Sequence, residues 1–168
     1  MLAGLDWGVL WRPPFGDQIG DAILLTIKIS FVSWIFAMLI GVVVGIAREA
    51  PVRLVRLAAS AHVELFRNIP VLVQLFFIYY VLPRVLPIEL RRVLFDLGWE
   101  VVAAVLTLSL YSSAKIAEHV RAGLKAVGRP LQQAALATGL TWWQAQRNVV
   151  ISLLLRIVAP SLTSEFVT

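Results

Sequence analysis

The sequence predicts an all-α integral membrane protein, built as a bundle of about four transmembrane helices. Of its 168 residues 60% are hydrophobic, whereas soluble globular domains contain roughly 45–50% apolar residues. The mean hydropathy is +0.84. Residues 29–47 carry no charge, and this length of helix crosses a hydrocarbon core of about 30 Å. Because lipid solvates apolar side chains that water cannot, such a composition is typical of membrane proteins.

The first predicted span covers about 22–47. Lys28 lies near its upstream edge, where the ammonium group can reach the headgroups. Ala37, Gly41 and Gly45 recur every four residues, and small residues at this spacing give a helix a flat face against which a neighbour can pack closely. Ordinary lipid-facing small residues would produce the same pattern, so both interpretations stay open.

The second predicted span covers about 60–83. Glu64 and Arg67 are three residues apart, which on a helix lets them form an ion pair near one membrane interface. Pro70 has no backbone donor and disfavours helix at Ile69, so we expect a kink or a break there.

Residues 83–98 are predicted to form a loop that contains one short interfacial helix. Trp99 would then lie at the aromatic belt of the membrane interface. A third span is predicted over about 99–117 and a fourth over about 148–168. Between them lies a polar segment, about 118–147.

The distribution of basic residues predicts the orientation. With the N-terminus outside, cytoplasmic segments hold nine of the fifteen Lys and Arg residues and outer segments hold four. Basic residues in short loops favour the cytosol, so residues 1–18 are expected outside and 118–147 inside. Topology therefore accounts for the net charge of +5, and nucleic acid is not needed as a partner.

The polar segment 118–147 has the signals of two short helices joined by a tight turn. Pro130 suits the first residue of a helix, and Gly139 suits a left-handed cap at its end. Thr141 and Gln144 have the spacing of a capping box that starts the next helix. Helices this short are marginal alone, which favours a docking element over a plain loop or a DNA-reading helix-turn-helix.

Few residues are suited to chemistry. The chain has no cysteine and two histidines, His62 and His119, so no metal site and no catalytic residue is predicted. A glycine-rich phosphate-binding loop is also absent from the sequence. An integral-membrane enzyme is therefore disfavoured, as is a passive channel lined by the glycine-rich first span.

Two motifs resemble a known family. Residues 64–83, ELFRNIPVLVQLFFIYYVLP, are similar to the pattern E-x-x-R-[GN]-x-P-x-L-V-Q-x-F-F-x-Y-x-x-L-P. Residues 117–140, AEHVRAGLKAVGRPLQQAALATGL, resemble the EAA motif. Both are typical of the membrane-spanning permease subunit of bacterial ABC importers, in the branch that takes up polar amino acids. The resemblance extends from about residue 20 to the end.

The resemblance implies a transmembrane domain of type I-like architecture over 19–168. Family members usually have five spans, so the chain resembles a permease truncated at its C-terminus. In the family, the EAA loop docks on a separate ATPase subunit. By resemblance the coupling residues are Gln133, Ala134, Ala135 and Gly139. The family has glutamate where this chain has Gln133, and proline where it has Ser152.

The implied function is ATP-driven import of a polar amino acid across the bacterial cytoplasmic (inner) membrane. The implied partners are the ATPase subunit, a second permease subunit in a homo- or heterodimer, and an extracytoplasmic substrate-binding protein. ATP would be used by the ATPase, and no cofactor is expected in this subunit. Arg67, Asn68 and Gln74 are candidates for the substrate path, although an ion pair that stabilises the kink is an equal alternative for this region. Another small solute, such as an opine or an amino acid derivative, and an inactive fragment also remain open.

Overall fold

The computed structural model describes residues 8, 11–50, 52–141, 144 and 148, and among them it contains helices and no strand. The all-α prediction is thus confirmed. In the described part of the chain six helices follow one another: α1 (Phe15–Ala47), α2 (Arg53–Asn68), α3 (Val71–Tyr80), α4 (Leu82–Val85), α5 (Ile88–Asp96) and α6 (Trp99–Ala137). The predicted fourth span, 148–168, lies almost wholly outside the described residues.

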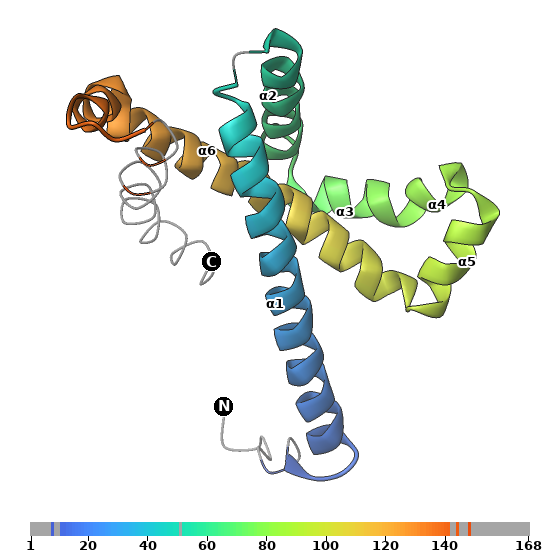
Figure 1. Cartoon of the computed structure of the whole chain (residues 1–168). Coiled ribbons are helices and arrows are strands. Elements are labelled where there is room, and N and C mark those ends of the chain that lie inside the picture. The colour runs from blue at the N-terminus through green and yellow to red at the C-terminus, as the bar shows by residue number, and fades with distance from the viewer. Residues whose placement is uncertain (1–7, 9–10, 51, 142–143, 145–147, 149–168) are drawn as a thin grey trace, which may run out of the picture.

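The two longest helices, α1 and α6, cross each other, and α2 lies close to this crossing (Figure 1). By length and composition, both contain a segment that can cross a membrane. The α2 helix and the α3–α4 segment could form a third span, although they are bent by 104° at the break between them. Helices α3 to α5 then lead back to the start of α6. Within the described residues the structure therefore has two or three candidate spans.

Small residues on α1 allow the close approach of α6. Ala37, Gly41 and Gly45 are all buried. A Cβ atom added to Gly41 would lie 2.6 Å from Ile116 Cγ2, and one added to Gly45 would lie 2.7 Å from Val120 Cβ. Since real Cβ atoms do not approach other atoms this closely, the two backbones can pack at this distance only with glycine. The flat face predicted from the four-residue spacing therefore contacts a protein helix and not lipid.

The first half of α1 extends beyond this contact. The helix begins at Phe15, well upstream of Lys28, whose side chain is exposed. A helix of 33 residues is about 50 Å long at 1.5 Å per residue. Because this exceeds the hydrocarbon thickness of about 30 Å, α1 must tilt or project from the membrane.

A second buried cluster joins α3 to the start of α6. Trp99 is only 4% exposed, and its Nε1 donates a 3.0 Å hydrogen bond to the carbonyl oxygen of Tyr79. Its ring is stacked on that of Phe95, with centroids 5.6 Å apart. Ile78 and Ala103 complete the cluster. The sequence placed Trp99 at the aromatic belt, but its indole packs against protein because α3 folds back over the start of α6.

Candidate functional site

Charged side chains gather where the end of α1 meets α2 and α6. Arg48 caps the C-terminus of α1 and is only 6% exposed. Its Nη1 donates a 2.7 Å hydrogen bond to Oε1 of Glu118 on α6. A buried guanidinium is stable only when an opposite charge compensates its loss of water. Glu118 provides this charge, so Arg48 and Glu118 hold the end of α1 against α6.

Two further arginines join this cluster. Arg67, in the last turn of α2, places Nη1 3.5 Å from the same Glu118 oxygen. Arg121, one turn beyond Glu118, places Nε 2.8 Å from Oε1 of Glu49. One carboxylate, that of Glu118, therefore interacts with α1 and α2 from its position on α6. We call these five residues, Arg48, Glu49, Arg67, Glu118 and Arg121, the junction cluster.

The predicted ion pair between Glu64 and Arg67 is wrong. Glu64 is exposed and forms no ion pair with Arg67 in the described chain, whereas Arg67 turns to Glu118. The i, i+3 spacing permitted the local pair. Packing of α2 beside α6 brings a second carboxylate within reach of Arg67, and that carboxylate already faces the buried Arg48.

The predicted break at Pro70 is confirmed. Helix α2 ends at Asn68, and Ile69 has extended backbone angles, φ −96° and ψ 129°. Helix α3 starts directly after the proline, at Val71. The chain therefore changes direction where the sequence predicted it.

Gln74 stabilises this break from inside the protein. Its side chain is 5% exposed, and its Nε2 donates hydrogen bonds to the carbonyl oxygens of Phe66, at 2.8 Å, and Ile69, at 2.7 Å. These carbonyls have lost their helical donors because α2 ends there. Arg67 and Asn68 lie at the same break, so the three candidates for the substrate path are close together. A contact with substrate remains a prediction for all three.

The end of α6 has the turn that the sequence predicted. The helix stops at Ala137, and Gly139 has φ +87°, a left-handed conformation that favours glycine. Thr141 then forms the capping box with Gln144: the Thr141 N–H donates to Gln144 Oε1 at 2.9 Å, and the Gln144 N–H donates to Thr141 Oγ1 at 3.4 Å. The turn and the contacts of the capping box are thus confirmed, whereas the helix expected after them lies almost wholly outside the described residues.

Pro130 does not begin a new helix. Helix α6 is continuous from Trp99 to Ala137, so the proline lies inside it and the first half of the predicted coupling loop is an extension of the membrane helix. An internal proline removes one backbone hydrogen bond and can be accommodated by a bend. The residues after it, LQQAALA, favour helix strongly. In Figure 1 the last part of α6, in orange, turns away from the rest of the helix.

The predicted coupling residues differ in exposure. Gln133, Ala134 and Gly139 are exposed, whereas Ala135 is 7% exposed and packs within the chain. Ser152 lies outside the described residues. The surface available to another protein at the end of α6 thus includes Gln133 and Ala134, whereas Ala135 is turned toward the chain itself.

Sequence reasoning missed Arg48 and its role in the junction cluster. The sequence offered one signal: Glu118 belongs to the EAA-like motif, and an acidic residue this close to a membrane span requires a partner. That partner lies 70 residues away in the chain, a separation that no helical spacing can indicate.

Comparison with known proteins connects this geometry to a family. Residues 37–168 match the family model described as "Binding-protein-dependent transport system inner membrane component". The "Glutamate/aspartate import permease protein GltJ" of Escherichia coli K12 is 36% identical over 170 residues, which cover 95% of this chain and 69% of that protein. The "Probable glutamine ABC transporter permease protein GlnP" of Bacillus subtilis is 30% identical over 149 residues, covering 88% of this chain and 64% of that protein.

A solved structure is also similar. It is titled "Crystal structure of an amino acid ABC transporter with histidines", and it superposes with a TM-score of 0.67 at 28% sequence identity. The match covers 92% of this chain and 71% of the other. The chain therefore spans about two thirds of the length of the proteins that it resembles.

Proposed function

The chain belongs to the family of binding-protein-dependent transport system inner membrane components. We therefore propose that the C-terminal end of its helix α6 couples an ATPase to the import of a polar amino acid. The subunit is a transport component and not an enzyme. Similar proteins carry names that refer to glutamate and aspartate, to glutamine and to arginine. These names favour an amino acid over an opine or another small solute.

One observation carries the coupling role: the exposed surface at Gln133 and Ala134 lies on the same helix that packs against α1 in the membrane domain. Helix α6 has 39 residues, about 58 Å at 1.5 Å per residue. A displacement of its exposed end can therefore reach the membrane domain through one continuous helix, which has no break in its backbone between Trp99 and Ala137. The turn at Gly139 and the capping box after it give the ATPase a folded element to hold.

The junction cluster gives such a displacement a structural consequence. Glu118 lies between the membrane part of α6 and its exposed end, and it interacts with both Arg48 and Arg67. Movement of α6 must either carry α1 and α2 along or separate these pairs. Packed helices that can adopt two alternative arrangements, here with the ion pairs kept or separated, are the usual basis of a conformational switch.

The proposed assembly contains two permease subunits, as a homo- or heterodimer, together with an ATPase and an extracytoplasmic substrate-binding protein. ATP is bound and hydrolysed by the ATPase, and this chain holds no cofactor. The proposed location is the bacterial cytoplasmic membrane, with the N-terminus outside. In this orientation the ends of α1 and α6 that carry Arg48 and Gly139 face the cytosol, where the ATPase acts.

Reconstitution tests the function directly. The permease, its ATPase and its binding protein are placed in liposomes, and uptake of labelled glutamate, glutamine and arginine is measured with and without ATP. We expect uptake of at least one of them that needs both ATP and the binding protein. Flux without ATP would instead indicate a channel. If none of the three amino acids were taken up in an ATP-dependent way, the proposed substrate class would be contradicted.

A further inference from the structure

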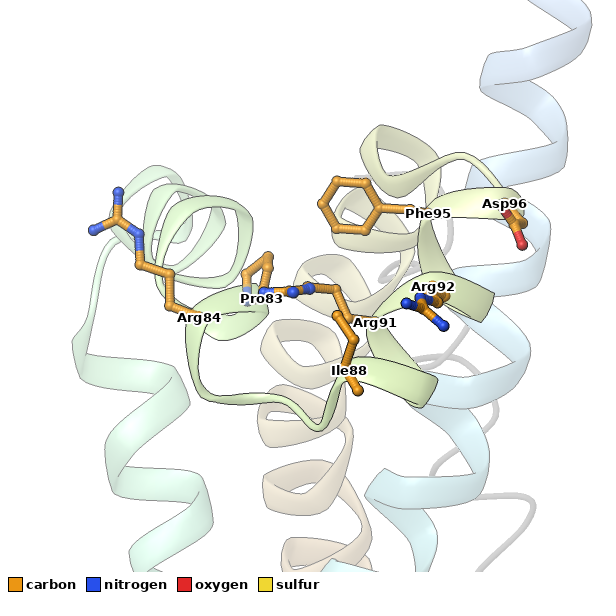
Figure 2. Close-up of a pocket in the computed structure, with 7 residues that line it drawn as sticks. All are labelled: Pro83, Arg84, Ile88, Arg91, Arg92, Phe95 and Asp96. Atoms are coloured by element: carbon orange, nitrogen blue, oxygen red, sulfur yellow. The ribbon is translucent and has the colours of Figure 1, made fainter.

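An open hollow of about 490 Å³ lies between the two short helices before α6. Pro83 and Arg84 line it from α4, and Arg91 and Phe95 line it from α5. Figure 2 shows the Arg91 side chain extending from α5 toward Pro83, with the Phe95 ring on the same side and Arg84 at the edge, directed outward. This hollow is remote from the junction cluster and has no part in the proposed coupling.

The lining of the hollow carries an excess of positive charge. Arg84, Arg91 and Arg92 contribute three guanidinium groups, and Asp96 contributes one carboxylate. Glu89 lies on the same helix, yet within the described part of the chain no carboxylate forms an ion pair with any of the three arginines. Arg91 is half-buried and the other two are exposed. Their charge is therefore available to an anion outside the chain.

Apolar side chains surround these arginines on the surface. Helix α5 has no buried residue. Val85 is 72% exposed, Leu97 68% and Val93 55%. In a chain with membrane-spanning helices, a short helix that combines exposed apolar residues with arginines is typical of the membrane interface. The apolar residues would contact acyl chains while the guanidinium groups remain at the level of the phosphates.

Topology does not explain these arginines. In the proposed orientation this segment lies on the outer side, where Lys and Arg are depleted in membrane proteins. Three of the four basic residues counted on that side are Arg84, Arg91 and Arg92. A local ligand of negative charge would account for such a concentration.

We propose that the hollow between α4 and α5 binds the headgroup phosphate of an anionic phospholipid. Arginine forms paired hydrogen bonds with phosphate oxygens. Arg91 is the half-buried arginine of the lining and is suited to this contact, and Arg84 and Arg92 are the exposed ones. The acyl chains lie along the exposed apolar side chains of α5. A phospholipid supplies both the anion and the apolar surface, whereas a soluble acidic protein would leave the apolar side chains to be covered separately.

Native mass spectrometry of the intact transporter, released from nanodiscs, tests the site. The probes are phosphatidylglycerol, which is anionic, and phosphatidylcholine, which has no net charge. We expect wild-type protein to retain phosphatidylglycerol more tightly. Arg91→Gln should weaken this retention about fivefold, since each basic residue near a lipid surface contributes about 1 kcal/mol. A triple variant that combines Arg84→Gln, Arg91→Gln and Arg92→Gln should weaken it further. Arg91→Lys should give an intermediate loss because it keeps the charge and loses the paired geometry.

The matched control is Arg53→Gln, which removes one exposed arginine from α2 and does not touch the hollow. Thermal unfolding in neutral detergent checks that all variants fold. If Arg91→Gln does not fold, the single variant Arg84→Gln, at an exposed residue, tests the site in its place. Equal weakening by Arg53→Gln and Arg91→Gln would overturn the proposal, because it indicates general attraction to anionic lipid. Unchanged lipid retention with a lower affinity for the substrate-binding protein would also overturn it, as would complete displacement of the lipid by glycerol phosphate alone.

Discussion

Arg48 and Glu118 lie 70 residues apart in the chain, and their side chains are joined by a hydrogen bond of 2.7 Å at the junction of α1 and α6. Arg48 is buried, and about a third of the Glu118 side chain is exposed. The pair is therefore intermediate between a surface ion pair, which contributes little, and a buried one, whose disruption strongly destabilises a protein.

Glu118→Gln should lower the free energy of unfolding by about 1–3 kcal/mol, because it leaves a buried guanidinium without a counter-charge. Thermal unfolding in detergent measures this change. The control is Glu49→Gln, whose partner Arg121 is more exposed than Arg48, and which should change stability by less than about 1 kcal/mol. Equal losses in the two variants would contradict the special place of Glu118.

Gly41→Val should destabilise the crossing of α1 and α6 by about 1–3 kcal/mol, since overpacking forces neighbouring atoms to move. A Cβ atom at Gly41 would already lie 2.9 Å from the carbonyl oxygen of Ser113. Gly20→Val is the matched control, because no atom lies within 4 Å of a Cβ atom at that position on the same helix. Thermal unfolding of both variants separates packing from helix propensity, and similar midpoints would argue against a close α1–α6 contact.

Gln74→Leu should lower stability by about 1–3 kcal/mol, because two carbonyl groups at the break would lose their donor. Asn68→Ala, exposed at the same break, should have little effect on stability. Measuring KM for uptake in both variants separates a structural role from a role in binding. An altered KM with unchanged stability in the Gln74 variant would place its amide on the substrate path.

Ala134→Arg should reduce co-purification of the ATPase without changing the unfolding temperature, because this residue is exposed at the end of α6. Ala122→Arg is the control: this residue is also exposed on α6, about three turns earlier. Ala135 is unsuitable for the experiment because it is buried within the chain. ATPase binding that survives Ala134→Arg would contradict docking at this surface.

Gly139→Ala should uncouple ATP hydrolysis from uptake, because the turn after α6 requires a left-handed backbone. Gly98→Ala is a close control, since Gly98 has φ +86° and Gly139 has φ +87°. Both substitutions should lower stability by about 1 kcal/mol. The number of amino acids imported per ATP hydrolysed should fall only in the Gly139 variant, and an equal fall in both would assign the effect to stability.

Local signals predicted local structure well. Pro70 predicted the break between α2 and α3, and Gly139 with Thr141 and Gln144 predicted the turn after α6. In each case the residue itself restricts the backbone or supplies the hydrogen bond. Pro130 was misleading because its preference for the start of a helix is statistical, and the strongly helical sequence on both sides prevails.

The sequence by itself determined the membrane class, the helical fold, the break at Pro70, the turn at Gly139 and the family. These depend on composition, on the lengths of uncharged stretches and on motifs whose residues are neighbours in the chain. Only the tertiary structure decided that Glu118 is shared by Arg48 and Arg67, that Gln74 faces inward, and that Ala134 and not Ala135 is exposed. The physical reason is that these outcomes depend on which helix faces lie together. A side chain such as Arg67 can reach more than one carboxylate, and the packing of the helices decides which of them it contacts.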